Sequence, residues 1–216
     1  PRKAVRRAGW LVAGLNALGL VLALLLMRPG APLAPLDERV AFLADGPLGW
    51  TIGWAAWFVA ALALAWFFGC LLAERAKSGL PTGLAKLALG MILVGAAVDL
   101  SCDVLQVTLL PQAAALARDT RDATAFLVLE RGLWAGGVIW ACGLYCSATL
   151  LTTWSRRAEL SLASRLSGLH TAMFGALWVG AELAQARALL EPATALTVGG
   201  FVVWAATITS PRPAAS

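Results

Sequence analysis

The sequence predicts an all-α, polytopic membrane protein: one integral-membrane domain over residues 1–216, built as a bundle of about six transmembrane helices. Charged residues make up only 13% of the chain, whereas soluble domains carry about 25%. The apolar residues occur in blocks of about 20, the length that a helix needs to cross the hydrocarbon core of a bilayer. Basic residues flank these blocks as orientation signals. Because they form no basic stripe with interleaved aromatics, a nucleic-acid partner is not expected.

The expected spans follow one another with mostly short connections. They run over about Gly9–Met27, Leu48–Ala73, Leu84–Leu110, Ala123–Trp154, Ser164–Ala186 and Ala193–Thr209. The basic segment before the first block, followed by a long apolar stretch, predicts an uncleaved signal anchor. The connection after the first span is long enough for a short interfacial helix within Asp37–Asp45. We expect its apolar side chains Val40, Phe42 and Leu43 to face lipid.

The orientation follows from the distribution of basic residues, which are enriched on the cytoplasmic side of membrane proteins. With the N-terminus inside, eleven basic residues fall at the inner ends: Arg2, Lys3, Arg6, Arg7, Arg75, Lys77, Lys86, Arg156, Arg157, Arg165 and Arg212. Five fall outside: Arg28, Arg39, Arg118, Arg121 and Arg187. Both termini are therefore expected in the cytoplasm, and the bacterial cytoplasmic membrane is the expected location.

Ionisable residues inside the apolar blocks mark the candidate site. They are Asp99, Asp103, Glu130, Arg131 and Glu182. Charges at membrane depth are costly, so these side chains should face the bundle interior. The rise per residue of a helix puts them at nearly one depth, in the outer half of the membrane. Asp99, Asp103 and Gln106 also share one stripe of the third span. We therefore predict one outward-facing site, with Arg131 contacting Asp99, Asp103 or a carboxylate of the fifth span.

The charge excess at this predicted site suggests what it binds. Four carboxylates and one guanidinium leave a formal charge of −3. Either one or more carboxylates are protonated at neutral pH, or a cation occupies the site. Oxygen ligands alone would favour a hard cation such as Mg²⁺, Ca²⁺ or Mn²⁺, and the sequence does not identify the metal.

Tryptophans near the same depth extend the candidate site to an aromatic pocket. Trp50, Trp54 and Trp57 form a stripe at the start of the second span, and Trp134 and Trp178 lie about one turn deeper than Arg131 and Glu182. Aromatic faces combined with carboxylates suit organic cations through cation–π attraction. An aromatic belt at the membrane surface is the favoured interpretation of the first three, and a place in the pocket is the alternative.

Few cofactors or catalytic groups are compatible with the remaining residues. The chain has a single histidine, His170, so a bis-His haem within this chain is excluded. Cys70, Cys102, Cys142 and Cys146 are typical of small buried apolar residues. A phosphate-binding glycine loop, a serine nucleophile elbow and a zinc-protease helix are not found in the sequence. The cofactor therefore remains unknown, and an enzyme is the less favoured class.

Three functional hypotheses remain open. The first is a transporter-like protein that binds protons or a small cation at the carboxylate/arginine site. The second is a non-catalytic accessory subunit of a larger membrane complex, in which the charges hold helices together. The third is a membrane-embedded lipid-modifying enzyme. The expected partners are the lipid bilayer and, for the second hypothesis, other membrane subunits or further copies of the chain.

Overall fold

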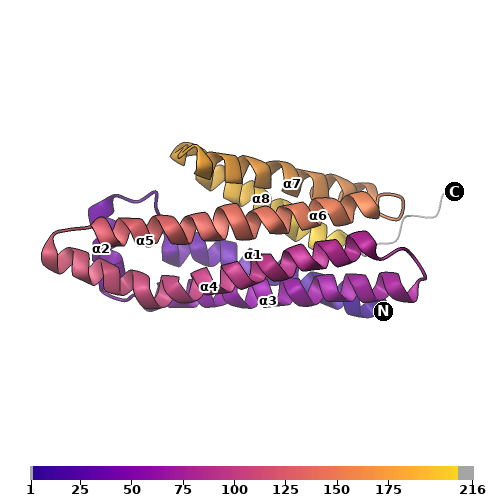
Figure 1. Cartoon of the computed structure of the whole chain (residues 1–216), viewed down its shortest axis with the longest axis horizontal. Coiled ribbons are helices and arrows are strands. Elements are labelled where there is room, and N and C mark those ends of the chain that lie inside the picture. The colour runs from indigo at the N-terminus through magenta and orange to yellow at the C-terminus, as the bar shows by residue number, and fades with distance from the viewer. Residues whose placement is uncertain (1, 209–216) are drawn as a thin grey trace.

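The computed structural model describes residues 2–208, and every regular element among them is a helix. The long helices lie roughly along the longest axis of the molecule (Figure 1). Their bounds are α1 (Arg2–Leu22), η1 (Ala23–Met27), η2 (Arg28–Gly30), α2 (Leu36–Ala44), α3 (Leu48–Lys77), α4 (Gly83–Thr120), α5 (Thr124–Trp134), η3 (Ala135–Cys142), α6 (Gly143–Ser155), α7 (Leu162–Leu183) and α8 (Arg187–Thr207). The predicted helical class is confirmed.

Five helical segments are long and apolar enough to cross a membrane. They are Arg2–Gly30, Leu48–Lys77, Gly83–Thr120, Thr124–Ser155 and Arg187–Thr207. The fifth expected span forms helix α7, which is not among the five because it carries more polar residues. Six spans and a cytoplasmic N-terminus therefore stay predictions. The predicted position of the C-terminus, with Thr209 and Arg212, lies outside the described residues.

Helix α4 is longer than predicted, because it continues through Pro111 to Thr120 instead of ending at Leu110. A proline inside a helix removes one backbone hydrogen bond. The turns on either side of it are well packed, since Leu110 and Ala114 are fully buried in one cluster with Phe126. This packing offsets the loss and keeps the helix continuous.

Helix α2 forms where the interfacial helix was predicted, but its orientation was predicted wrongly. Leu43 is fully buried and Val40 nearly so, and both pack in the same apolar cluster as Trp50. Half-buried Phe42 contacts the edge of Trp50, with ring centroids 6.3 Å apart. The segment folds back over α4, so its apolar face is covered by protein rather than by lipid.

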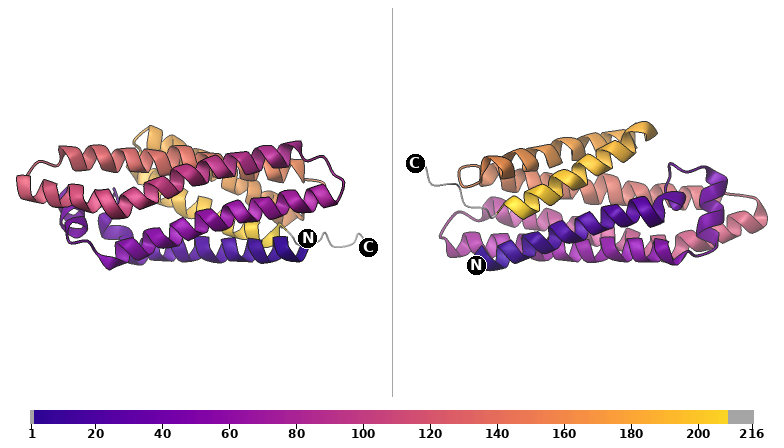
Figure 2. Two further views of the ribbon diagram at one scale, coloured as in Figure 1. Left: turned by 60° about the horizontal axis from the view of Figure 1, so that its bottom comes forward. Right: turned by 180° about the vertical axis from the view of Figure 1, so that it is seen from behind.

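Helices that follow one another in the chain pack as antiparallel neighbours and form one bundle. In Figure 1 the α7–α8 pair lies along one edge, α3 and α4 lie along the other, and α5–α6 runs between them. Figure 2 shows α1 beside α3, and α1 also packs against α8. One apolar cluster surrounds Phe67, Phe68 and Trp204, and another surrounds Trp50 and Phe126.

Candidate functional site

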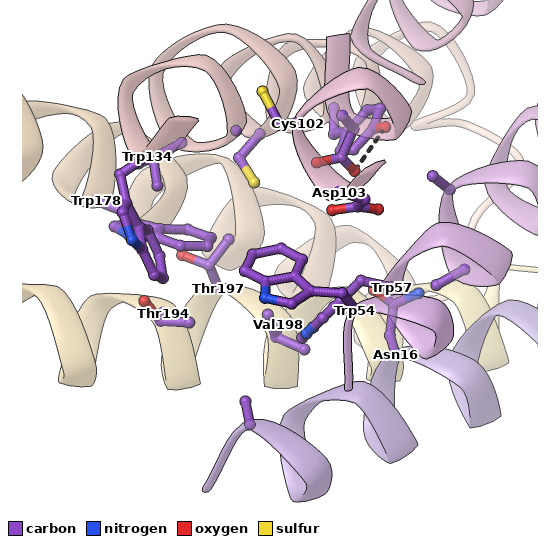
Figure 3. Close-up of a pocket in the computed structure, with 18 of the residues that line it drawn as sticks. Asn16, Trp54, Trp57, Cys102, Asp103, Trp134, Trp178, Thr194, Thr197 and Val198 are labelled. Atoms are coloured by element: carbon purple, nitrogen blue, oxygen red, sulfur yellow. Dashed lines mark hydrogen bonds between the residues drawn. The ribbon is translucent and has the colours of Figure 1, made fainter. Parts of the chain in front are cut away.

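A cavity of about 200 Å³ lies between the helices near the middle of the bundle. Most of its wall is apolar, and all five tryptophans proposed from the sequence line it: Trp50, Trp54 and Trp57 from α3, Trp134 from α5 and Trp178 from α7. Figure 3 shows four of these indoles arranged around the space. Trp50 meets Trp54, and Trp54 meets Trp134, each edge to face, with ring centroids 5.6 and 6.2 Å apart.

Two carboxylates from the middle of α4 form the acidic wall of this aromatic cavity. Asp99 and Asp103 lie one turn apart, and both line the space. The Tyr145 hydroxyl donates a hydrogen bond to Oδ2 of Asp99 at 3.1 Å. Asp103 is only 2% exposed, and neither of its carboxylate oxygens has a hydrogen-bond partner among the described residues. Asp103 therefore presents unused acceptors to the cavity.

Gln106 continues the same face of α4 and is also buried, at 1% exposure. Its backbone carbonyl accepts a hydrogen bond from Nε1 of Trp50 at 2.8 Å. Its side-chain oxygen Oε1 has no partner among the described residues. The predicted stripe of Asp99, Asp103 and Gln106 thus lines one cavity, with a second unused acceptor beside Asp103.

A π-helical segment faces the aspartates. Segment η3 joins α5 to α6 and approaches α4 closely, because a Cβ atom on Gly136 would lie 2.7 Å from Sγ of Cys102. A Cβ atom on Gly137 would lie 4.0 Å from Oδ1 of Asp99. Short π-helical segments are rare and occur frequently at functional sites, so η3 adds weight to this cavity as the candidate site.

Glu130 is separated from this cavity and has its own cation. Arg39 of α2 binds it with both ends of the guanidinium: Nε donates to Oε1 at 2.9 Å and Nη2 donates to Oε2 at 3.0 Å. Both side chains are almost fully buried. Nη1 of Arg39 also donates to the backbone oxygen of Ala34. The pair fixes α2 against α5, which is a structural role.

Sequence reasoning missed Arg39, which was counted only as an orientation signal in an outer loop. Its position one turn before Leu43 on α2 was the available signal, because residues four apart share a helix face. Leu43 is buried, so the same face carries Arg39 inwards. Because this face was predicted to contact lipid, the contact between Arg39 and Glu130 was not predicted.

Arg131 and Glu182 line a second cavity, a cleft of about 330 Å³ that also includes Gln185 and Arg187. Nη2 of Arg131 donates to Oε1 of Gln185 at 3.4 Å. Asp99 and Asp103 line the other cavity, so the predicted contact of Arg131 with either of them is not formed among residues 2–208. Glu182, the carboxylate of the fifth expected span, does share the cleft with Arg131, although the two side chains form no salt bridge there. Neighbouring helix residues point about 100° apart. Arg131 therefore points towards the α7–α8 turn, while Glu130 points towards α2.

The five predicted charges lie along two separate cavities. Asp99 and Asp103 line the aromatic cavity, whereas Glu130, Arg131 and Glu182 line the cleft. Arg39 neutralises Glu130, and Glu182 shares the cleft with Arg131 and Arg187. Among the described residues that line the aromatic cavity there is no lysine, arginine or histidine. Trp134 lines both spaces, so its indole stands between them. Of the predicted carboxylates, Asp99 and Asp103 are therefore the two without a cation among the described residues of their own cavity.

Among the described residues no group of three or more histidine, cysteine, aspartate and glutamate side chains is arranged to hold a metal ion. Comparison of the chain with protein-family models, with curated proteins and with solved structures finds no significant match. The aromatic cavity, with its two aspartates and five tryptophans, is therefore the feature that points to a function.

Proposed function

We propose that this protein is a transporter-like membrane protein that binds a small organic cation in the aromatic cavity. The observation that carries the proposal is Asp103, a buried carboxylate whose two oxygens have no hydrogen-bond partner within residues 2–208 and that faces a space walled by indoles. A buried charge is strongly unfavourable unless it is paired. A bound cation supplies the missing partner.

The cavity walls favour an organic cation over a bare inorganic ion. Trp54, Trp57 and Trp134 offer aromatic faces, and a cation over an indole gains about 0.5–2 kcal/mol, the higher value when it is desolvated. Inorganic cations such as Ca²⁺ instead take about six to eight oxygen ligands. A cationic group with an apolar body would use both the carboxylates and the indoles.

The size of the cavity limits the ligand. An apolar protein cavity of about 150 Å³ accommodates benzene, and this cavity is somewhat larger, at about 200 Å³. A ring-sized apolar body bearing one ammonium group fits this space. Exchange of a proton for such a cation at Asp99 and Asp103 would supply the coupling that a transporter needs.

Benzyltrimethylammonium is a suitable probe, because it combines an aromatic ring with a fixed positive charge. We expect the full-length protein in detergent to bind it in isothermal titration calorimetry. Asp103→Asn is expected to weaken binding by about 30-fold or more, because truncating one member of a buried charge pair costs at least about 2 kcal/mol. Trp54→Leu is expected to weaken it less, by about three- to tenfold.

Two controls make this measurement specific. Asp119→Asn removes a carboxylate from the exposed end of the same helix and is expected to leave the affinity unchanged. Neopentylbenzene, the neutral isostere of the probe, is expected to bind far more weakly. Equal affinity for the neutral isostere, or full affinity in Asp103→Asn, would show that the cavity does not recognise cations through its carboxylates.

A further inference from the structure

The cleft beside the α7–α8 turn differs in chemistry from the aromatic cavity. It lies between α5 and the N-terminal end of α8, and Arg131, Gln185 and Arg187 are exposed there. Figure 1 shows this turn ending beside α5, short of the α4–α5 turn. The cleft is thus placed on the side of the bundle, where a ligand can reach it laterally.

The charge balance of the cleft favours an anion. Glu130 is held by two hydrogen bonds from Arg39, so its charge is already compensated. Arg131, Arg187 and Glu182 remain, two cations and one anion. Arginine presents a planar fork of donors that matches phosphate oxygens in pairs. Two guanidinium groups on facing elements are a suitable arrangement for one phosphate.

Gln185 follows the C-terminal end of α7 and has a φ of +54°, the left-handed conformation in which helices commonly end. The side chain spans the cleft edge: Oε1 accepts from Arg131, and Nε2 donates to the backbone oxygen of Glu182 at 2.9 Å. This conformation orients Arg131 towards the cleft.

The rest of the cleft is apolar. Pro32, Leu127, Val128, Trp134 and Leu190 line it next to the charged groups. Val128 is 69% exposed on the outer face of α5, the face that lipid would cover in a membrane. A ligand with a phosphate and an attached apolar part would match both halves of the lining.

We propose that this cleft binds a phosphodiester group of the kind that a membrane phospholipid presents. Arg131 and Arg187 contact the phosphate, and Glu182 contacts the amine of a headgroup that carries one. The site shares Trp134 with the proposed organic-cation site, but the two are lined by different charged side chains, so their charged groups can be changed separately.

Native mass spectrometry of the full-length protein in detergent, with dioleoylphosphatidylethanolamine added, tests the proposal. We expect the wild type to retain one phospholipid. The Arg131→Gln/Arg187→Gln double variant is expected to bind it about tenfold or more weakly, because it removes both charged donors to the phosphate. Arg121→Gln is the matched control, because Arg121 is exposed and lies outside the cleft.

Two further ligands distinguish the source of the phosphate. Dioleoylglycerol has the acyl chains without the phosphate and is expected not to be retained. Inorganic phosphate alone is expected to have little effect on thermal stability. If it instead stabilises the wild type but not the double variant, the anion site is upheld and its source is a free phosphate.

Equal retention of dioleoylglycerol, or unchanged phospholipid binding in the double variant, would overturn the proposal. The single variant Arg187→Gln provides a second test, because Arg187 is exposed and its replacement should not disturb folding. Binding of benzyltrimethylammonium is expected to persist in all these variants, which separates the failure of one site from the failure of the other.

Discussion

In the ion pair between Arg39 and Glu130, the burial of each charged side chain depends on the presence of the other. Each side chain is almost fully buried, and the two are joined by two parallel hydrogen bonds. Such a pair adds little relative to apolar residues, but the loss of one member leaves the other charge buried and unpaired. The contribution of the pair to stability is therefore measured by comparing each single variant with the double variant.

Arg39→Met is expected to lower the free energy of unfolding by about 3–5 kcal/mol, because it leaves Glu130 buried without its partner. The double variant Arg39→Met/Glu130→Met is expected to be milder than Arg39→Met alone. Denaturant titration in mixed micelles, followed by circular dichroism, measures both. Additive effects would show that the two residues are not coupled. The exposed Arg118, which pairs with Asp45 at 2.9 Å, supplies the control variant Arg118→Met, which should change little.

Replacement of Asp103, unlike replacement of Arg39, is expected to stabilise the protein while it weakens ligand binding. The Asp103 carboxylate has no hydrogen-bond partner in the described part of the chain, so Asp103→Asn removes an uncompensated charge and should raise the free energy of unfolding by about 1 kcal/mol or more. The same variant should lose organic-cation binding. Asp99→Asn should stabilise less, because Asp99 accepts a hydrogen bond from Tyr145. A destabilised Asp103→Asn would indicate that the carboxylate has a structural partner.

At the scale of the helix, glycines determine how closely neighbouring elements approach. Gly9 of α1 lies against the backbone of α8, where an added Cβ atom would overlap the carbonyl oxygen of Ala205 and lie 3.3 Å from a ring carbon of Phe67. Backbone atoms cannot move aside as a flexible side chain can. The α1–α8 contact thus depends on a residue without a side chain at this position.

Gly9→Ala is expected to destabilise the protein by about 1–3 kcal/mol, because the extra methyl group forces α1 away from α8. Gly14→Ala on the same helix is the matched control, since an added Cβ atom there meets nothing within 4 Å. It should be neutral or stabilise by up to about 1 kcal/mol through helix propensity. Thermal unfolding of the two variants gives the comparison, and equal effects would argue against close α1–α8 packing.

At the scale of the whole molecule, the arrangement of helices bears on membrane topology. The contact between Gly9 and Ala205 places the start of α1 beside the end of α8, at the same end of the bundle. If the bundle spans a membrane, two chain ends on the same side require an even number of membrane crossings. Helix α7 runs antiparallel to α8 and packs along it, which supports the prediction that α7 crosses the membrane as well.

Reporter insertions test this topology directly. Insertions at Gly79 and Glu159 are expected to report the cytoplasm, because the basic residues gather at that end. Insertions at Gly46, Arg121 and Gln185 are expected to report the outer side. A cytoplasmic signal at Gln185 alone would show that α7 does not cross, and reversed signals at all five positions would overturn the orientation.

Much of the local structure follows from the sequence by itself. The apolar blocks predicted helices whose bounds agree closely with α3 and with α5–η3–α6, because helix formation and burial depend on residues near in the chain. The stripe of Asp99, Asp103 and Gln106 follows from the period of one helix. The aromatic lining followed from depth along each helix, which the rise per residue determines.

Only the tertiary structure decided which charges meet. Arg39 and Glu130 are 91 residues apart in sequence, and no local pattern specifies how α2 folds back over α4. The direction of each side chain around α5 separated Glu130 from Arg131. One predicted cluster therefore became an aromatic cavity that contains Asp99 and Asp103 and a separate cleft that contains Arg131, Glu182 and Arg187. Depth along a helix is a property of the sequence, whereas the rotation and pairing of helices depend on how all of them pack together.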